Sequence, residues 1–182
     1  TLNKFTLQNS YGDVSWKLGK VRIVWGELEG ISILDIINPF AGSSSRGNGD
    51  GDVGQWALTA DYFIGDDTLS VFSILRPAIS SEIIPLASDN NQPEFGLKYQ
   101  HPFQNGQLSL YAAQLLPQSA VIDLDAVTSS AQHYHLMGLS YNYAHSGVLW
   151  EFDLGYKSGQ ERSDLIGLSK HDRFDLGVGF EY

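Results

Sequence analysis

Charged side chains recur in segments of the chain that otherwise alternate between apolar or aromatic residues and small or polar ones. Successive side chains of a β-strand point to opposite faces, so these charges would gather on one face of a sheet. They could form a conduit whose charges are layered, or pair with one another inside a small barrel, where an unpaired buried charge is costly. The residues that we predict to face this lumen are Asp61, Arg76, Lys98, Glu151, Asp153, Arg173 and Asp175.

The histidines offer two further chemistries. His133 and His135 stand two residues apart, which suits a pair of metal ligands on one strand face. No third ligand is evident, and we predict that both lie at the rim of a sheet. His145 and Ser146 could serve a hydrolase, but they occupy a predicted turn without a nearby carboxylate, and the chain has no Gly-x-Ser-x-Gly elbow. We therefore predict no catalytic residue, no metal site and no cofactor.

A third group has the spacing of a calcium-binding loop. Asn48, Asp50 and Asp52 alternate in a stretch rich in glycine, serine and aspartate. An EF-hand loop needs glycine at its sixth position and glutamate at its twelfth, where this chain has Val53 and Thr59. A solvated loop is therefore favoured over the alternative, a loose calcium site on the surface.

Composition excludes several classes of protein. The chain has 182 residues, enough for one domain, and its net charge of −10 argues against a nucleic-acid partner. It contains no cysteine, so neither disulfides nor thiolate metal sites are available. No run of eighteen apolar residues predicts a transmembrane helix, and no signal peptide opens the chain.

The clearest element is a predicted hairpin at Gln132–Lys157 with a turn at His145-Ser146. Tyr141 would then lie opposite Trp150 on an apolar and aromatic face, while the other face is polar or small. Each arm has about eleven residues, the length with which a tilted strand crosses a bilayer. Aromatic residues lie near both ends of the apolar face, as in strands of outer-membrane barrels.

The remaining strands follow the same alternation and are separated by two kinds of connection. We predict nine strands, and a tenth at Glu161–Leu168 or a larger barrel would restore the even number that bacterial barrels have. Short turns that alternate with long loops are the outer-membrane barrel arrangement. The predicted turns are 12–13, 66–67, 105–106 and 145–146, and the predicted long loops are 26–55, 77–93, 117–131 and 158–171.

Two features of the first long loop are predicted. Ala41–Gly54 has few apolar side chains and many glycines, so we expect it to be mobile. Glu27, which closely follows Trp25, is a candidate anchor of this loop through an ion pair with Arg22 or Arg46.

One stretch resembles a known family. Val21–Pro39 contains Trp25-Gly26-Glu27 and Asn38-Pro39, and it is similar to the "GR-x-x-x-WGE … DxINP" stretch of the Gram-negative proteins grouped as domain of unknown function thirteen-oh-two. Met137–Tyr141 and Gly177–Tyr182 resemble later segments of that family. The chain departs from it in having Gly19-Lys20 where the family has Gly-Arg, and in its length, since family members are several times longer.

The resemblance implies an outer-membrane barrel, a periplasmic lipid-handling partner and an inner-membrane exporter of the resistance-nodulation-division type, and it implies no catalytic residue. Together with the strand pattern, it predicts an antiparallel transmembrane up-and-down β-barrel in a Gram-negative outer membrane. We expect contacts with membrane lipid or lipopolysaccharide and a role as a channel or as an export or handover component for a small or hydrophobic solute. The alternatives are a soluble β-barrel that binds a hydrophobic ligand and, last, a barrel-wall hydrolase.

Overall fold

The computed structural model describes residues 5–26, 28, 33–34, 37, 55–75, 77, 92–117, 121–123, 128–164 and 167–182. These residues form β-strands and their connections, and none of them is helical. In this part of the chain there is accordingly no helix long and apolar enough to cross a membrane.

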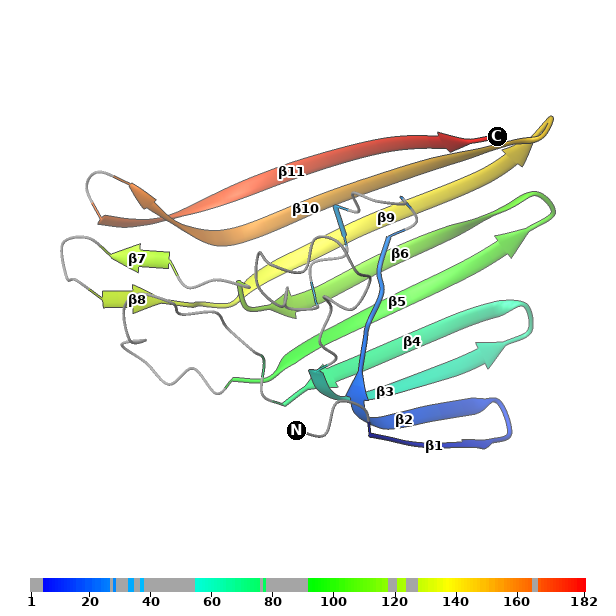
Figure 1. The fold of residues 1–182 in the computed structure, drawn as a ribbon, viewed down its shortest axis with the longest axis horizontal. Helices are drawn as coiled ribbons and strands as arrows, with labels where there is room; N and C mark the ends of the chain where they lie inside the picture. The colour runs from blue at the N-terminus through cyan, green and yellow to red at the C-terminus, as the bar shows by residue number, and fades with distance from the viewer. Residues whose placement is uncertain are drawn as a thin grey trace.

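Nine antiparallel strands form one sheet in which each strand pairs with its neighbours along the chain, so the topology is up-and-down (Figure 1). A separate small hairpin, β7 (Val121–Asp123) and β8 (Thr128–Ser130), comes between β6 and β9 along the chain, while β6 and β9 pair directly in the sheet. The nine strands are β1 (Thr6–Tyr11), β2 (Val14–Val21), β3 (Gln55–Ile64), β4 (Asp67–Ile74), β5 (Glu94–Phe103), β6 (Gly106–Leu115), β9 (Tyr134–His145), β10 (Val148–Asp164) and β11 (Gly167–Glu181).

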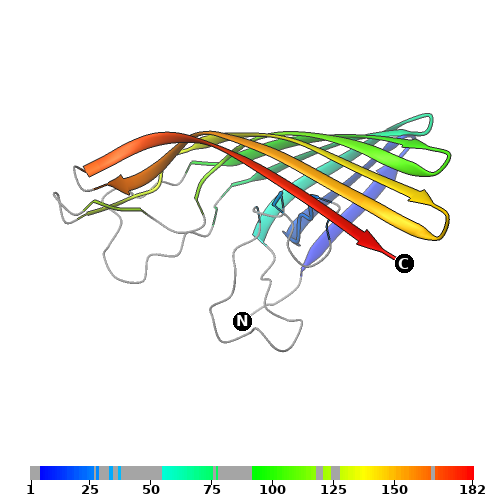
Figure 2. The same cartoon turned by 90° about the horizontal axis from the view of Figure 1, so that it is seen from above.

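The sheet arches but does not close into a barrel (Figure 2). Among the described strands, β1 pairs only with β2 and β11 only with β10, so both edges of the sheet stay open. The predicted all-β, up-and-down architecture with nine strands is confirmed. The predicted closure is not, because the curvature that nine strands accumulate does not bring β1 and β11 together.

The predicted hairpins form, with the turn at Gly12-Asp13 as expected and the other three turns one residue earlier or later. Tyr141 pairs with Phe152 rather than with Trp150, a shift of two residues in register. Ser146 and Gly147 both have positive φ, 53° and 81°, as a tight hairpin turn of type I′ requires. A shift of two preserves the face on which each side chain lies, so the predicted faces are retained.

The predicted turn at Asn105-Gly106 moves for a local reason. Gly106 is already part of β6, and a Cβ at this position would collide with the carbonyl oxygen of Asn142 on β9. The glycine therefore permits two strands to approach closely, and the turn uses Gln104 and Asn105 instead.

The predicted long loop at 158–171 is wrong. β10 continues to Asp164 and β11 begins at Gly167, with a bulge between Lys157 and Gln160. Glu161–Leu168 is consequently no tenth strand but belongs to this long hairpin. Residues 158–164 are polar or glycine on both faces, so alternation of hydrophobicity does not reveal a strand that backbone pairing still forms.

The other long connections are described only in part. The predicted 117–131 loop contains the small β7–β8 hairpin. Ala41–Gly54 and the calcium-like residues within it lie outside the described residues, as does most of 77–93.

Part of the connection after β2 lies on the concave side of the sheet (Figures 1 and 2). The core consists of side chains from this connection and from the concave face. We call residues 22–26, 28, 33–34 and 37 the inner segment. Trp25 packs on Phe72 and Tyr111 with ring-centroid distances of 5.3 and 5.1 Å. The buried cluster consists of Ile23, Trp25, Leu34, Ile37, Ala57, Phe72, Ile74, Tyr111, Leu115, Tyr134 and Leu136.

Candidate functional site

The convex face of the sheet is exposed and apolar. Side chains on this face alternate with the buried ones, as Met137, which is 64% exposed, does with Leu136, which is 1% exposed. Monomeric soluble proteins rarely expose a continuous apolar patch larger than a few hundred Å². We call this surface the outer belt; its exposed members include Leu18, Trp56, Leu58, Tyr62, Val71, Phe95, Leu97, Leu110, Met137, Trp150, Phe152, Tyr156, Phe174, Leu176, Val178 and Phe180.

Aromatic rings gather at the short-turn end of the outer belt. Tyr141 stacks on Phe103 with a centroid distance of 5.5 Å and also contacts Phe152 at 6.2 Å. Trp150 on β10 contacts Phe180 on β11 at 5.9 Å. The strand register brings these rings, from β5, β9, β10 and β11, to one end of five neighbouring strands, an arrangement that resembles an aromatic girdle.

Polar contacts border the outer belt at both ends. At the short-turn end, Asp67 accepts a hydrogen bond from the Tyr99 hydroxyl at 2.7 Å and lies 2.6 Å from Nδ1 of His101. At the opposite end, the Tyr156 hydroxyl donates to Asp172 at 2.7 Å. The apolar surface is thus a band of limited height rather than an entire face.

Charged side chains lie on the concave face of β10 and β11, and the neighbouring part of β9 contributes the polar Ser140. Ser140 donates to Asp153 at 2.6 Å, and both residues are fully buried. Asp175 lies between Lys157, at 2.9 Å, and Arg173, at 2.7 Å. Two positively charged side chains therefore flank the Asp175 carboxylate, and this pairing offsets the cost of burying its negative charge.

The second group of predicted lumen residues lies on β3 and β5. Asp61 accepts a hydrogen bond from Ser70 at 2.6 Å, and Nζ of Lys98 sits 5.4 Å from the centre of the Tyr111 ring. The structure therefore separates the predicted set into two clusters, one on β3 and β5 and one on β10 and β11. Arg76 and the candidate anchor Glu27 lie outside the described residues.

Glycines allow the inner segment to lie directly on the sheet. A Cβ at Gly138 would come within 2.8 Å of Leu34, and a Cβ at Gly177 would collide with Leu28. Side chains at these positions would push the inner segment away from β9 and β11. Gly138 and Gly177 on the concave face therefore accommodate the inner segment, and this part of the face is covered by protein rather than by water.

Sequence reasoning missed Glu94, the first residue of β5. Its side chain is only 4% exposed; Oε1 accepts the backbone N–H of Leu116 at 2.7 Å, while Oε2 has no hydrogen-bond partner within the described part of the chain. The sequence did hold a signal for Glu94. It stands an even number of positions from Lys98, and such residues of a strand lie on the same face, here the concave one. This hydrogen bond connects the first residue of β5 with the residue that follows β6.

We expect Glu94→Gln to fold at least as stably as the original chain, because the amide oxygen still accepts the Leu116 N–H and no charge is buried. Glu94→Leu leaves that N–H without its acceptor and should be less stable than Glu94→Gln by about 1–3 kcal/mol. Urea unfolding of both variants in detergent, followed by circular dichroism, measures the difference. Equal stability of the two variants would show that this bond contributes nothing.

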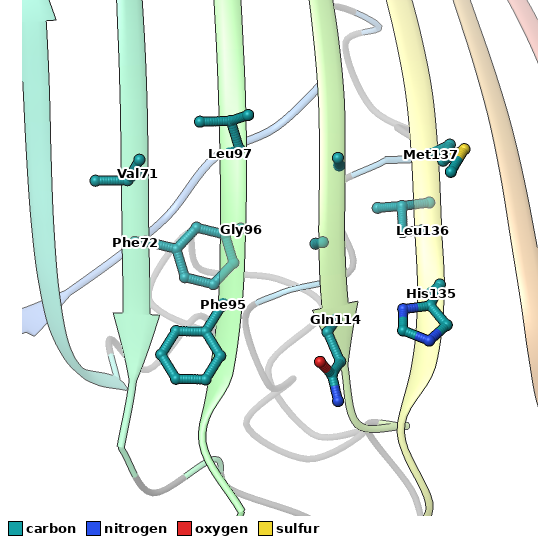
Figure 3. A pocket seen from close by; sticks show the side chains of 11 residues that line it. Val71, Phe72, Phe95, Gly96, Leu97, Gln114, His135, Leu136 and Met137 are labelled. Carbon is teal, nitrogen blue, oxygen red and sulfur yellow. The ribbon is translucent and has the colours of Figure 1, made fainter.

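A shallow groove interrupts the outer belt between β4 and β9 (Figure 3). It has a volume of about 500 Å³ and almost entirely apolar walls, which include Val71, Leu97 and Met137. The small side chain of Ala112 on β6 leaves this space between its larger neighbours.

The structure does not bring further ligands or catalytic groups to the two histidine-containing pairs considered from the sequence. His133 contacts the carbonyl oxygen of Pro93 at 3.2 Å, and His135 is exposed on the outer face. Ser146 forms a tight turn beside His145, whose ring stacks on Tyr143. Among the described residues, no three His, Cys, Asp or Glu side chains are grouped so as to hold a metal ion.

Comparison with known proteins identifies no relative of this chain. No protein-family model, curated protein or solved structure matches the chain. The resemblance of Val21–Pro39 to an outer-membrane family thus stays a prediction from its residues.

Proposed function

We propose that the chain forms part of the wall of a transmembrane β-barrel in a Gram-negative outer membrane. The observation that carries this proposal is the reversed polarity of the sheet over β10 and β11. Leu176 and Phe180, on the outer face, are 67% and 64% exposed, whereas Asp153 on the concave face is fully buried. Water would favour the opposite arrangement, since burial of apolar surface is the main source of stability. Hydrocarbon around the outer belt removes this conflict.

The shape of the sheet supports the same proposal. Its strands are joined by tight turns at one end, and its aromatic rings cluster beside those turns. The open edges at β1 and β11 leave backbone groups that hydrocarbon cannot satisfy. In a membrane, both edges would therefore pair with further strands, from the same or another chain.

The proposed role is passage or handover of a small or hydrophobic solute without catalysis. The concave face supplies polar and charged side chains, and the inner segment narrows the space that this face encloses. Lipid and lipopolysaccharide would surround the outer belt. The family resemblance adds a periplasmic lipid-handling partner and an inner-membrane exporter as proposed partners.

One observation favours a second candidate, a soluble β-protein that binds a hydrophobic ligand. The apolar groove of about 500 Å³ on the outer face has the size of a small-molecule site. The two candidates differ in their need for detergent. A soluble protein stays monodisperse without it, whereas a chain with the outer belt in lipid aggregates.

Site-directed labelling tests the membrane proposal, because the chain has no cysteine of its own. Leu176→Cys places a fluorescent label in the outer belt, and Lys170→Cys places one on the same strand beyond the polar border at Asp172. In phospholipid vesicles, we expect a lipid-soluble quencher to reach position 176 and a water-soluble quencher to reach position 170. Quenching of both labels from water alone would overturn the proposal.

A further inference from the structure

The groove in the outer belt has a defined place in the strand register. Val71 of β4, Leu97 of β5, Ala112 of β6 and Met137 of β9 form one cross-strand row on the outer face. Leu97 and Met137, which are 41% and 64% exposed, stand on either side of the short Ala112 side chain (Figure 3). One methyl group thus lies between two long apolar side chains, and the space that it leaves open is the groove.

Polar side chains border one end of this groove. Phe95, Gln114 and His135 form the next row on the same face, at the end of the strands that carries the long connections. Gln114 pairs directly with His135, and both side chains are exposed. The amide of Gln114 carries two N–H donors, and a neutral imidazole carries one. Among the described residues that line the groove there is no lysine, arginine, aspartate or glutamate.

An apolar floor with uncharged donors at one end suits an acyl chain that is attached through a carbonyl group. Lipid hydrocarbon is as apolar as the outer belt, so a particular lipid is held there by close packing and hydrogen bonds rather than by the hydrophobic effect. The groove offers the packing, and Gln114 and His135 offer the hydrogen bonds. A free fatty acid would bring a carboxylate to a row without a cation, whereas a glycerolipid brings an uncharged ester.

We propose that the groove binds one acyl chain of a glycerophospholipid, with the ester carbonyl oxygen of that chain accepting hydrogen bonds from Gln114 and His135. This inference deepens the proposed function and rests on it, because phospholipid reaches the groove when the outer belt faces a bilayer. The other lipids around the belt exchange freely, since they meet side chains of more even height and lack this pair of donors.

Native mass spectrometry tests the proposal on the full chain, released from detergent micelles that contain phosphatidylethanolamine. We expect one lipid to stay bound in a saturable manner. Ala112→Leu fills the groove and should lower the affinity at least tenfold. Ala60→Leu is the matched control, because Ala60 pairs with Val71 on the same face but does not line the groove, and it should leave the affinity unchanged. Equal retention by Ala112→Leu and the original chain would overturn the site.

The polar end of the groove is tested separately. Gln114→Leu and His135→Leu should each weaken binding roughly fivefold, the loss of one neutral hydrogen bond. An ether-linked phosphatidylethanolamine of the same chain length lacks the carbonyl group, so it should bind more weakly than the ester lipid and be insensitive to both substitutions. Equal binding of the ether and ester lipids would overturn the role of the two donors.

Palmitate distinguishes the two sources of an acyl chain. We expect it to bind more weakly than phosphatidylethanolamine, and tighter binding of palmitate would overturn the assigned class of ligand. The labels at positions 176 and 170 report on the membrane independently. If the label at 176 is quenched from lipid but no phospholipid is retained, this inference fails and the proposed function stands.

Discussion

Replacement of Trp25 by alanine is expected to lower the free energy of unfolding by about 3–5 kcal/mol, the cost of removing a buried large aromatic side chain. Trp25 is 3% exposed and contacts both Phe72 and Tyr111. Its loss would leave a cavity under the inner segment and free that segment from the sheet. Urea unfolding in detergent, monitored by circular dichroism, measures the effect.

Trp56→Ala is the matched control for this prediction. Trp56 lies on the outer face and is 49% exposed, so its removal leaves no enclosed cavity and should cost much less. The structure would be contradicted if both substitutions had the same cost, since the inner segment would then not form the core.

Arginine in place of Leu176 is the second substitution with a large expected effect. Leu176 lies midway along the exposed apolar residues of β11, pairs with Leu154 and is flanked on its own face by Phe174 and Val178. If this position is near the bilayer midplane, a charge there should cost about 2–4 kcal/mol. Unfolding of the protein from phospholipid vesicles measures the cost directly.

The same substitution separates the membrane proposal from its soluble alternative. Because Leu176 is 67% exposed, arginine at this site in a soluble protein should change stability by no more than about 0.5 kcal/mol. Leu176→Ala controls for the lost side chain without adding charge. His171→Arg, on the same strand beyond the outer belt, controls for the added charge and should be nearly neutral. A neutral Leu176→Arg in vesicles would contradict a lipid-facing outer belt.

The faces of the hairpins could be predicted more securely than their register. Apolar and polar residues alternate along each strand, and this pattern depends only on neighbours in the chain. The pairing of Tyr141 with Phe152 instead of Trp150 depends on where the turn forms. Ser146 and Gly147 adopt the left-handed conformations that this turn needs, and the prediction placed the turn one residue too early.

The polar end of the long β10–β11 hairpin could not be recognised in the same way. Residues such as Glu161 and Lys170 pair across it through their backbones, and a pattern of side-chain polarity does not report this pairing. The prediction of a loop at 158–171 failed for this reason.

By itself, the sequence determined that this is an all-β chain of nine up-and-down strands with one apolar and one polar face, because strand periodicity is a local property. Only the tertiary structure decided that the sheet stays open and that the inner segment covers its polar face. It also decided that Glu94 is buried. These features depend on contacts between residues distant in the chain, such as Leu34 against Gly138, and local alternation carries no information about which distant segment will fill a face.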